Sequence, residues 1–299
     1  MKKLLIVGAN GFTGRRLLTD FASDPSYQVT VCSLNPDIAP SQGYEFIQTD
    51  IRDTAALRQL FETVCPEVVV NTSALSVPDY CENHRAEADL LNTRAVEQMA
   101  QLCEAFHARL IHLSTDFVFD GNTDRLYTED DIPLPVNYYG LTKLAGEKAV
   151  ARHCSDYAIV RVVIIYGKSL PLQHGNIFQL VAHKLRNGET IRVVSDQWRT
   201  PTFVGDISVG IERLIAVPVN GIFHICGKDH ISIAEIAYRV TDYLRLDRSL
   251  IRPVTTAEMR ETTPRPRDSG LSIEKARRIL GYEPRSIEEG MKETFGCTH

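Results

Sequence analysis

The sequence predicts an α/β protein with a doubly wound parallel sheet and a smaller C-terminal α/β lobe. In the first half of the chain, short runs rich in β-branched residues alternate with segments of helical periodicity. Such alternation is typical of strand–helix–strand units, in which parallel strands lie between two layers of helices. After about residue 168 the rhythm changes and polar stretches separate the elements, which indicates a second lobe.

Each predicted strand of the sheet is short and mostly apolar. Strands are expected at Leu4–Val7, Val29–Cys32, Glu45–Ile47, Val68–Val70, Leu110–Leu113 and Ile159–Val163. Apolar residues spaced for one helix face predict helices at Arg15–Phe21, Thr54–Val64, Arg85–Phe106 and Tyr139–Arg152. We expect the Asp53 side chain to cap the second of these helices.

The second half of the chain predicts a lobe that is interrupted by a return to the sheet. A strand is expected at Ile191–Val194, followed by a helix at Asp206–Ala216 and a strand at Ile222–Ile225. We therefore assign residues 1–168, with 204–228, to the sheet domain. Residues 169–203 and 229–299 are assigned to the lobe.

Composition and charge exclude several classes of protein. Hydrophobic residues make up 43% of the 299 residues and charged residues 24%, the balance of an ordinary globular protein. A net charge of −5 without any Lys/Arg-rich run argues against a nucleic-acid partner. No run approaches the roughly 18 apolar residues of a membrane span, so no membrane association is expected.

The cysteines predict a reducing compartment. They are seven in number, scattered along the chain and never arranged as CxxC, so we expect free thiols in the cytoplasm. Cys81 and His84 have a spacing found in metal sites, but no second pair completes the set. No metal site is predicted.

A glycine-rich turn follows the first predicted strand directly. It reads GANGFTG over residues 8–14 and opens into the first predicted helix. Glycines let the backbone approach a pyrophosphate, and the helix directs N–H groups and its positive dipole end at the same anion. The context predicts a Rossmann-type dinucleotide-binding domain. The expected phosphate contacts are Gly8, Gly11, Phe12, Thr13 and Gly14.

The end of the second predicted strand bears on the choice of cofactor. An acidic residue there would bind the adenosine ribose of NAD, but the sequence has Ser33. Without that carboxylate a 2′-phosphate is not repelled, and Arg15 and Arg16 could attract one. The sequence thus favours NADP(H), with NAD(H) as the alternative. The two arginines are equally compatible with solvated helix residues.

A phenol and an amine are placed for proton transfer. Tyr139 and Lys143 lie one helical turn apart on one face, and a neighbouring cation would lower the pKa of the phenol. Thr115 follows the fifth predicted strand, at the edge where open α/β sheets bind ligands, and its hydroxyl could orient a carbonyl. Tyr138 lacks a lysine four residues on and is not the expected acid.

These motifs resemble the extended short-chain dehydrogenase/reductase family and, within it, the dTDP-4-dehydrorhamnose reductases. The GxxGxxG spacing is typical of the extended family. STDFVFDG at residues 114–121 is similar to the STDYVFDG run of those reductases, and YGLTKLAGE at 139–147 to their YGxTKLxGE. Similar motifs continue through residues 161–167, 196–202 and 265–271, so the resemblance covers nearly the whole chain.

The resemblance implies NAD(P)H-dependent reduction of the C4 keto group of a nucleotide-linked 4-keto-6-deoxy sugar, as in dTDP-L-rhamnose biosynthesis. The implied catalytic residues are Thr115, Tyr139 and Lys143. The implied cofactor contacts beyond the glycine turn are Asp50, Ile51, Asn71, Thr72, Ser73, Tyr139 and Lys143. The implied substrate contacts in the lobe and beside the strand ends are Asp116, Asn176, Gln197, Arg199 and Pro201.

Two departures from the family pattern bear on the substrate. Ile164 stands where those reductases often have tryptophan, and Trp198 and Arg199 fall within a segment that usually reads DQxGxPT. Arg199 could meet a substrate diphosphate through its planar fork of donors, or it could cap a surface loop.

Two other functions remain open from the sequence. A nucleotide-sugar epimerase would keep its NAD bound and return the hydride to the same substrate. The regulatory subunit of methionine adenosyltransferase shares this fold and much of the STD…YxxxK pattern, and there the fold serves a protein partner. Assembly as a homodimer is compatible with either.

Overall fold

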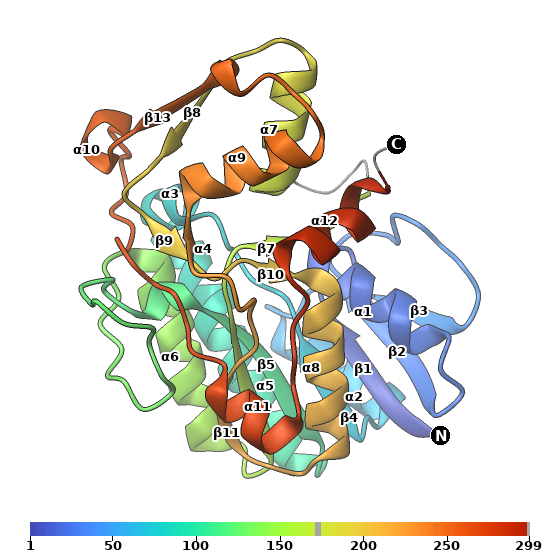
Figure 1. Cartoon of the computed structure of the whole chain (residues 1–299). Helices are drawn as coiled ribbons and strands as arrows, with labels where there is room; N and C mark the ends of the chain where they lie inside the picture. The colour runs from blue at the N-terminus through green and yellow to red at the C-terminus, as the bar shows by residue number, and fades with distance from the viewer. Residues whose placement is uncertain (171–174, 298–299) are drawn as a thin grey trace.

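The computed structural model describes residues 1–170 and 175–297, and within them a seven-stranded parallel sheet forms the centre of the molecule (Figure 1). Its order is β11-β6-β5-β4-β1-β2-β3, which confirms the predicted fold class. The strands are β1 (Lys2–Val7), β2 (Tyr27–Ser33), β3 (Tyr44–Gln48), β4 (Val68–Asn71), β5 (Arg109–Thr115), β6 (Tyr157–Val162) and β11 (Gly221–His224). Leu4, Leu5 and Ile6 of β1 are fully buried, because helices cover both faces of the sheet.

The strand order reverses beside β1. This strand pairs with β2 on one side and with β4 on the other, so the chain runs outward to β3 and then crosses back. In open α/β sheets the crevice outside the carboxyl ends of the strands at such a point is where ligands bind.

Two layers of helices cover the sheet. On one face lie α1 (Phe12–Ala22), α8 (Val204–Ala216) and α11 (Glu274–Leu280), and on the other lie α2 (Thr54–Val64), α5 (Ala95–Ala105) and α6 (Tyr138–His153). Asp53 caps α2 as predicted, accepting hydrogen bonds from the N–H groups of Ala55 and Ala56. Nowhere in the described parts of the chain is a helix long and apolar enough to cross a membrane.

The helix predicted at Arg85–Phe106 is confirmed over residues 85–105, but it contains a π-helical turn. Its parts are α4 (Arg85–Asp89), the π-helical segment η1 (Leu90–Arg94) and α5 (Ala95–Ala105). The wider π turn directs the Asn92 side chain inward, where it accepts from the N–H of Leu75 and donates to the hydroxyl of Thr142 on α6. These partners are distant in sequence, so helical periodicity gave no sign of the π turn.

The lobe stands over the carboxyl ends of the strands (Figure 1). Its two-stranded sheet pairs β8 (Ile191–Val194) with β13 (Ile251–Val254) in parallel. The helices that pack around it or close to it are α7 (Ile177–Arg186), α9 (Ile233–Tyr243), α10 (Thr256–Met259) and α12 (Ile287–Phe295). Residues 171–174, which were assigned to the lobe, lie outside the described residues.

Short elements connect the lobe to the sheet domain. They are the pair β7 (Ile165–Tyr166) and β10 (Thr202–Phe203), the pair β9 (Trp198–Arg199) and β12 (Ile231–Ser232), and helix α3 (Pro78–Asn83). The strand β11 joins the main sheet beside β6. Helix α11, assigned to the lobe from sequence, instead packs on α8 and β11, because Ala276 and Leu280 face the core of the sheet domain.

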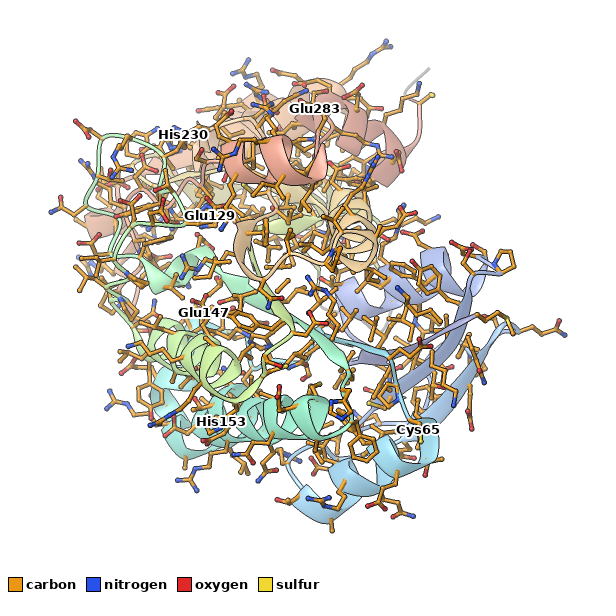
Figure 2. All side chains as sticks on the ribbon, turned by 90° about the horizontal axis from the view of Figure 1, so that it is seen from below. Cys65, Glu129, Glu147, His153, His230 and Glu283 are labelled. Atoms are coloured by element: carbon orange, nitrogen blue, oxygen red, sulfur yellow. The ribbon has the colours of Figure 1, made fainter. Side chains whose placement is uncertain are left out.

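A buried ion pair links α6 to the sheet. Glu147, labelled in Figure 2, accepts two hydrogen bonds of 2.7 and 2.9 Å from Arg161 of β6. The side chains are only 4% and 1% exposed. Removal of one partner from such a pair leaves an uncompensated charge in the core, whereas replacement of both partners by apolar groups is often tolerated.

We expect Arg161→Met to lower the free energy of unfolding by about 3–5 kcal/mol, because Glu147 then stays buried without its partner. The control is the double variant Arg161→Met/Glu147→Met, which should recover much of this loss. Urea unfolding followed by circular dichroism measures both. A single variant as stable as the wild type, or a double variant less stable than the single, contradicts this account of the pair.

Candidate active site

A cavity of about 770 Å³ lies between the carboxyl ends of the central strands and the lobe. The sheet domain contributes the glycine turn and the end of β5, and the lobe contributes β8 and the start of α7. Of the predicted site residues, the following line the cavity: Gly11, Phe12, Thr13, Thr72, Thr115, Asp116, Tyr139, Lys143, Asn176, Gln197 and Arg199. The structure thus brings residues from both halves of the chain to one site.

The glycine turn is shaped for a bound anion. Gly8 has a φ of +90°, and a Cβ there would lie 2.8 Å from Thr72 Oγ1. A Cβ on Gly14 would lie 2.2 Å from the carbonyl oxygen of Gly8, so only glycine lets α1 begin this close to the strand. The residue at the start of α1 is Gly11, which has no side chain to cap the backbone N–H groups of the first turn. A dinucleotide pyrophosphate fits this cradle.

The two arginines near the turn are both engaged in ion pairs. Arg15 contacts Asp37 and donates to the carbonyl oxygen of Ala39, and Arg16 pairs with Asp20 at 2.7 Å. Both arginines therefore have carboxylate partners, Asp37 for Arg15 and Asp20 for Arg16, which the argument from sequence did not include. The preference for NADP(H) stays a prediction.

We expect Asp37→Asn to increase affinity for NADPH relative to NADH by roughly tenfold, because the freed Arg15 becomes available to a 2′-phosphate. The dissociation constants can be measured by quenching of intrinsic fluorescence. Asp20→Asn is the matched control, since it frees Arg16 instead. An unchanged NADPH/NADH ratio in Asp37→Asn means that Arg15 does not face the 2′ position.

Helix α6 carries the proton-transfer residues. Asn137 caps it by accepting a hydrogen bond of 2.9 Å from the N–H of Gly140, which fixes Tyr139 in the first turn. Tyr139 and Lys143 are 8% and 2% exposed, and the Thr115 hydroxyl lies near enough to the phenol to affect its pKa. The predicted triad of Thr115, Tyr139 and Lys143 therefore lies in one wall of the cavity.

The expected effect of Lys143 on the phenol is wrong for the structure as it stands. Burial raises the pKa of Tyr139, and the hydrogen bond with Thr115 lowers it only in part. The Lys143 amine donates instead to the carbonyl oxygen of Leu113 at 2.7 Å. Tyr139 is thus held as the neutral phenol, which is the form that can donate a proton.

Thr115 is part of a buried polar cluster. Its hydroxyl donates to Asp116 at 3.1 Å and accepts from the N–H of Phe117 at 3.2 Å. Burial raises the pKa of Asp116, while Arg199 and the Ser269 hydroxyl act in the opposite direction. Because the single proton of Thr115 is given to Asp116, the hydroxyl has to turn before it can donate to a group in the cavity.

Arg199 supports this cluster from the lobe. It is 2% exposed and lies 3.5 Å from the Asp116 carboxylate. Its other N–H groups donate to carbonyl oxygens that include those of Trp198 and Pro266. The guanidinium is therefore occupied as a counter-ion and a link between strands, so the structure gives no support to a diphosphate contact by Arg199.

The other predicted contacts occupy varied positions. Asn176 caps α7, and the Gln197 amide donates to Glu261 at 3.0 Å. Pro201 is outside the cavity lining, with its carbonyl oxygen against Gly227. Predicted cofactor residues that do not line the cavity are Gly8, Gly14, Asp50, Ile51, Asn71 and Ser73.

Sequence reasoning missed several residues of the lobe wall. Arg265 lines the cavity and pairs with Asp79 and Glu261, and Arg192 lines it from β8. Arg265 had a signal, since it opens one of the family motifs. For Arg192 the only sign in the sequence is its place in a predicted strand. Side chains alternate along a strand, so Arg192 lies on the face opposite to Ile191 and Val193.

A parallel sheet with a glycine turn at its switch point, and a hydroxyl, a phenol and an amine beside it, define the oxidoreductase fold of the extended short-chain dehydrogenases/reductases. The chain belongs to the family described as the RmlD substrate binding domain, whose model matches residues 1–297.

Two relatives of this chain have different described functions. Methionine adenosyltransferase 2 subunit beta of Xenopus laevis is 32% identical over 299 residues, covering 98% of this chain and 87% of that protein. A probable low-salt glycan biosynthesis reductase of Haloferax volcanii is 29% identical over 287 residues, covering 96% and 95%.

Solved structures resemble this protein over nearly its whole length. The dTDP-4-dehydrorhamnose reductase of Bacillus anthracis, in complex with NADP, has a TM-score of 0.85 at 28% identity and covers 99% of both chains. The dTDP-4-dehydrorhamnose reductase of Yersinia enterocolitica has a TM-score of 0.85 at 26% identity, again over 99% of both chains. A UDP-glucose 4-epimerase of Thermotoga maritima, at 20% identity and a TM-score of 0.86, shows the fold alone.

Proposed function

We propose that the protein reduces the C4 keto group of a nucleotide-linked 4-keto-6-deoxy sugar with a reduced nicotinamide cofactor. The observation that carries this proposal is the wall formed by Thr115, Tyr139 and Lys143, which faces the same cavity as the glycine turn. Burial holds Tyr139 as a neutral phenol, the state required of a proton donor to a forming alkoxide. The two reductases among the solved structures support the sugar class.

A nicotinamide dinucleotide, when bound, supplies the hydride. The residues of the glycine turn would hold its pyrophosphate, and Tyr139 would give its proton to the carbonyl oxygen of the substrate. Thr115 would orient the phenol and, once its hydroxyl turns from Asp116, donate to the same oxygen. Asp116 keeps Arg199 and the Ser269 hydroxyl as partners during that turn. Lys143 would return a proton to Tyr139.

The lobe wall suits a nucleotide diphosphate. Arg192 is exposed at the cavity, and Arg265 has 29% of its side chain exposed. These arginines take the role that the sequence had given to Arg199, because their guanidinium groups reach solvent while that of Arg199 does not. We propose a dTDP-linked sugar such as dTDP-4-dehydrorhamnose as the substrate to test first.

We expect Tyr139→Phe to lower kcat for this substrate by about 10²–10⁴-fold, because the phenol proton has no substitute in the buried wall. Loss of reduced-nicotinamide absorbance measures the rate. Binding of the cofactor should stay within a few fold of wild type, which separates loss of chemistry from loss of the site. Wild-type turnover by Tyr139→Phe contradicts the proposed mechanism.

A second function is supported by the identity of 32% over 98% of this chain to a subunit of methionine adenosyltransferase. In that case the protein would bind a synthetase partner and turn over no sugar. Purified protein can be assayed against a panel of nucleotide-linked keto sugars and, separately, for co-elution with a methionine adenosyltransferase catalytic subunit. Co-elution without any turnover favours the regulatory role, and turnover without co-elution favours the reductase.

A further inference from the structure

Three buried polar side chains form a line behind the cavity wall. Asn71 ends β4, His112 lies in β5 and Lys143 projects from α6, and their exposed fractions are 1%, 0% and 2%. The Asn71 amide nitrogen lies 3.1 Å from His112 Nδ1, and His112 Nε2 lies 3.3 Å from Lys143 Nζ. The mechanism above uses Lys143 but gives no role to His112.

The hydrogen bonds of Asn71 fix the proton on His112. The amide oxygen of Asn71 accepts from the backbone N–H of Ser73 at 3.0 Å and from its hydroxyl at 2.6 Å. The amide N–H group must therefore point at His112 Nδ1, which acts as the acceptor. Burial, together with the nearby Lys143, holds the pKa of His112 well below its usual range, so the ring is neutral. Its one proton is then on Nε2.

This arrangement conflicts with an ammonium at Lys143. The Nε2–H of His112 points at Nζ, while Nζ itself donates to the carbonyl oxygen of Leu113. A neutral amine has a lone pair that can accept from His112, but an ammonium has donors only. If the proton of His112 were on Nδ1 instead, the donor–donor contact would lie between Nδ1 and the amide nitrogen of Asn71. All three side chains are satisfied together when Lys143 is the amine.

We propose that His112 is a positioning residue that stabilises the amine form of Lys143 and so favours release of its proton. The proposal deepens the proposed function and rests on it for the role of Lys143. After Tyr139 has protonated the substrate oxygen, the ammonium of Lys143 gives a proton to the phenolate through a water in the cavity that both residues line. An N–H bond breaks, an O–H bond forms, and the amine that remains accepts from His112. Water in the open cavity then returns a proton to the amine.

His112 does not itself carry the proton onward. To do so, Nδ1 would have to take up a proton as Nε2 released one, and the group that faces Nδ1 is the Asn71 amide, which has no proton to release. The role of His112 is therefore that of a fixed donor.

Other charged groups around Lys143 are few. Burial lowers the pKa of Lys143 to about 8, and Glu147, one turn further along α6, acts in the opposite direction. The titratable groups presented by the packed elements are Tyr139 and Glu147 of α6, Arg161 of β6, Asp116 in the 3₁₀ turn η2 (Asp116–Val118) and Cys81 of α3. Glu147 is already paired with Arg161, and Asp116 and Cys81 act on Tyr139.

The test is a titration of Lys143 in the protein without cofactor. Lysine labelled with ¹³C at the ε position reports the midpoint by NMR, and Lys143→Arg assigns the resonance. We expect a midpoint near 8 in the wild type and about one pH unit higher in His112→Phe, which removes the donor.

A second variant reverses the direction of the same hydrogen bonds. In Asn71→Asp the carboxylate accepts from Nδ1–H, so Nε2 becomes an acceptor for the ammonium, and the added charge acts in the same direction. The midpoint of Lys143 should again rise by at least about one unit. Ser73→Ala is the matched control, because the backbone N–H of Ser73 still orients Asn71, and the midpoint should stay at the wild-type value.

Two results would overturn the proposal. One is a wild-type midpoint near the ordinary lysine value of about 10.4. The other is an unchanged midpoint in both folded variants. If His112→Phe does not fold, the midpoint in Asn71→Asp decides. The titration needs no substrate, so its failure contradicts the role of His112 alone, whereas wild-type turnover by Tyr139→Phe contradicts the proposed function. In the reductive assay the rate should fall as pH rises through about 8, and this fall should move upward by the same amount in His112→Phe.

Discussion

The geometry of the site depends on how closely α6 approaches the 3₁₀ turn η2, which follows β5, and the π-helical segment η1. A Cβ on Gly140 would lie 2.1 Å from the carbonyl oxygen of Phe117, and one on Gly146 would lie 2.5 Å from that of Asn92. Both distances are far below any normal contact, so backbone atoms of two other segments require these two glycines, six residues apart on one helix. Tyr139 and Lys143 lie beside and between these glycines, and the same contacts fix them against Thr115.

Close packing of this kind brings polar groups out of water, and the structure compensates each in a different way. Glu147 and Arg161 neutralise one another, and Asp116 is balanced by Arg199 and a serine hydroxyl. Lys143 has a backbone carbonyl and a histidine as its partners and no carboxylate in contact. The site therefore contains one buried amine without a paired anion, at the position where a proton has to be exchanged rather than held.

The sequence predicted what is local and missed what depends on distant partners. The helix at Thr54–Val64 has its predicted bounds, because Asp53 caps its start and Cys65 ends it in the left-handed region. The proton-transfer residues could be predicted because Tyr139 and Lys143 share a helix face and Thr115 ends a strand. The π turn at Asn92 needs Leu75 and Thr142, and the burial of Arg199 needs carbonyl groups from residues 266 and 267. No pattern within a window of the sequence contains such pairs.

Contacts between residues that are distant in sequence also bear on the choice between a reductase and a regulatory subunit. The fold is common to both relatives, so the sheet and the glycine turn do not separate them. The buried line from Asn71 to Lys143 is different in kind, because it fills the interior with polar groups that are fully satisfied in only one protonation state. A protein whose only task is to bind a partner would gain stability from apolar side chains at these positions. Tyr139 and Lys143 themselves belong to the YxxxK pattern that the regulatory subunit largely shares, so the part of this line that could separate the two functions is the pair Asn71 and His112, which holds the Lys143 amine from behind.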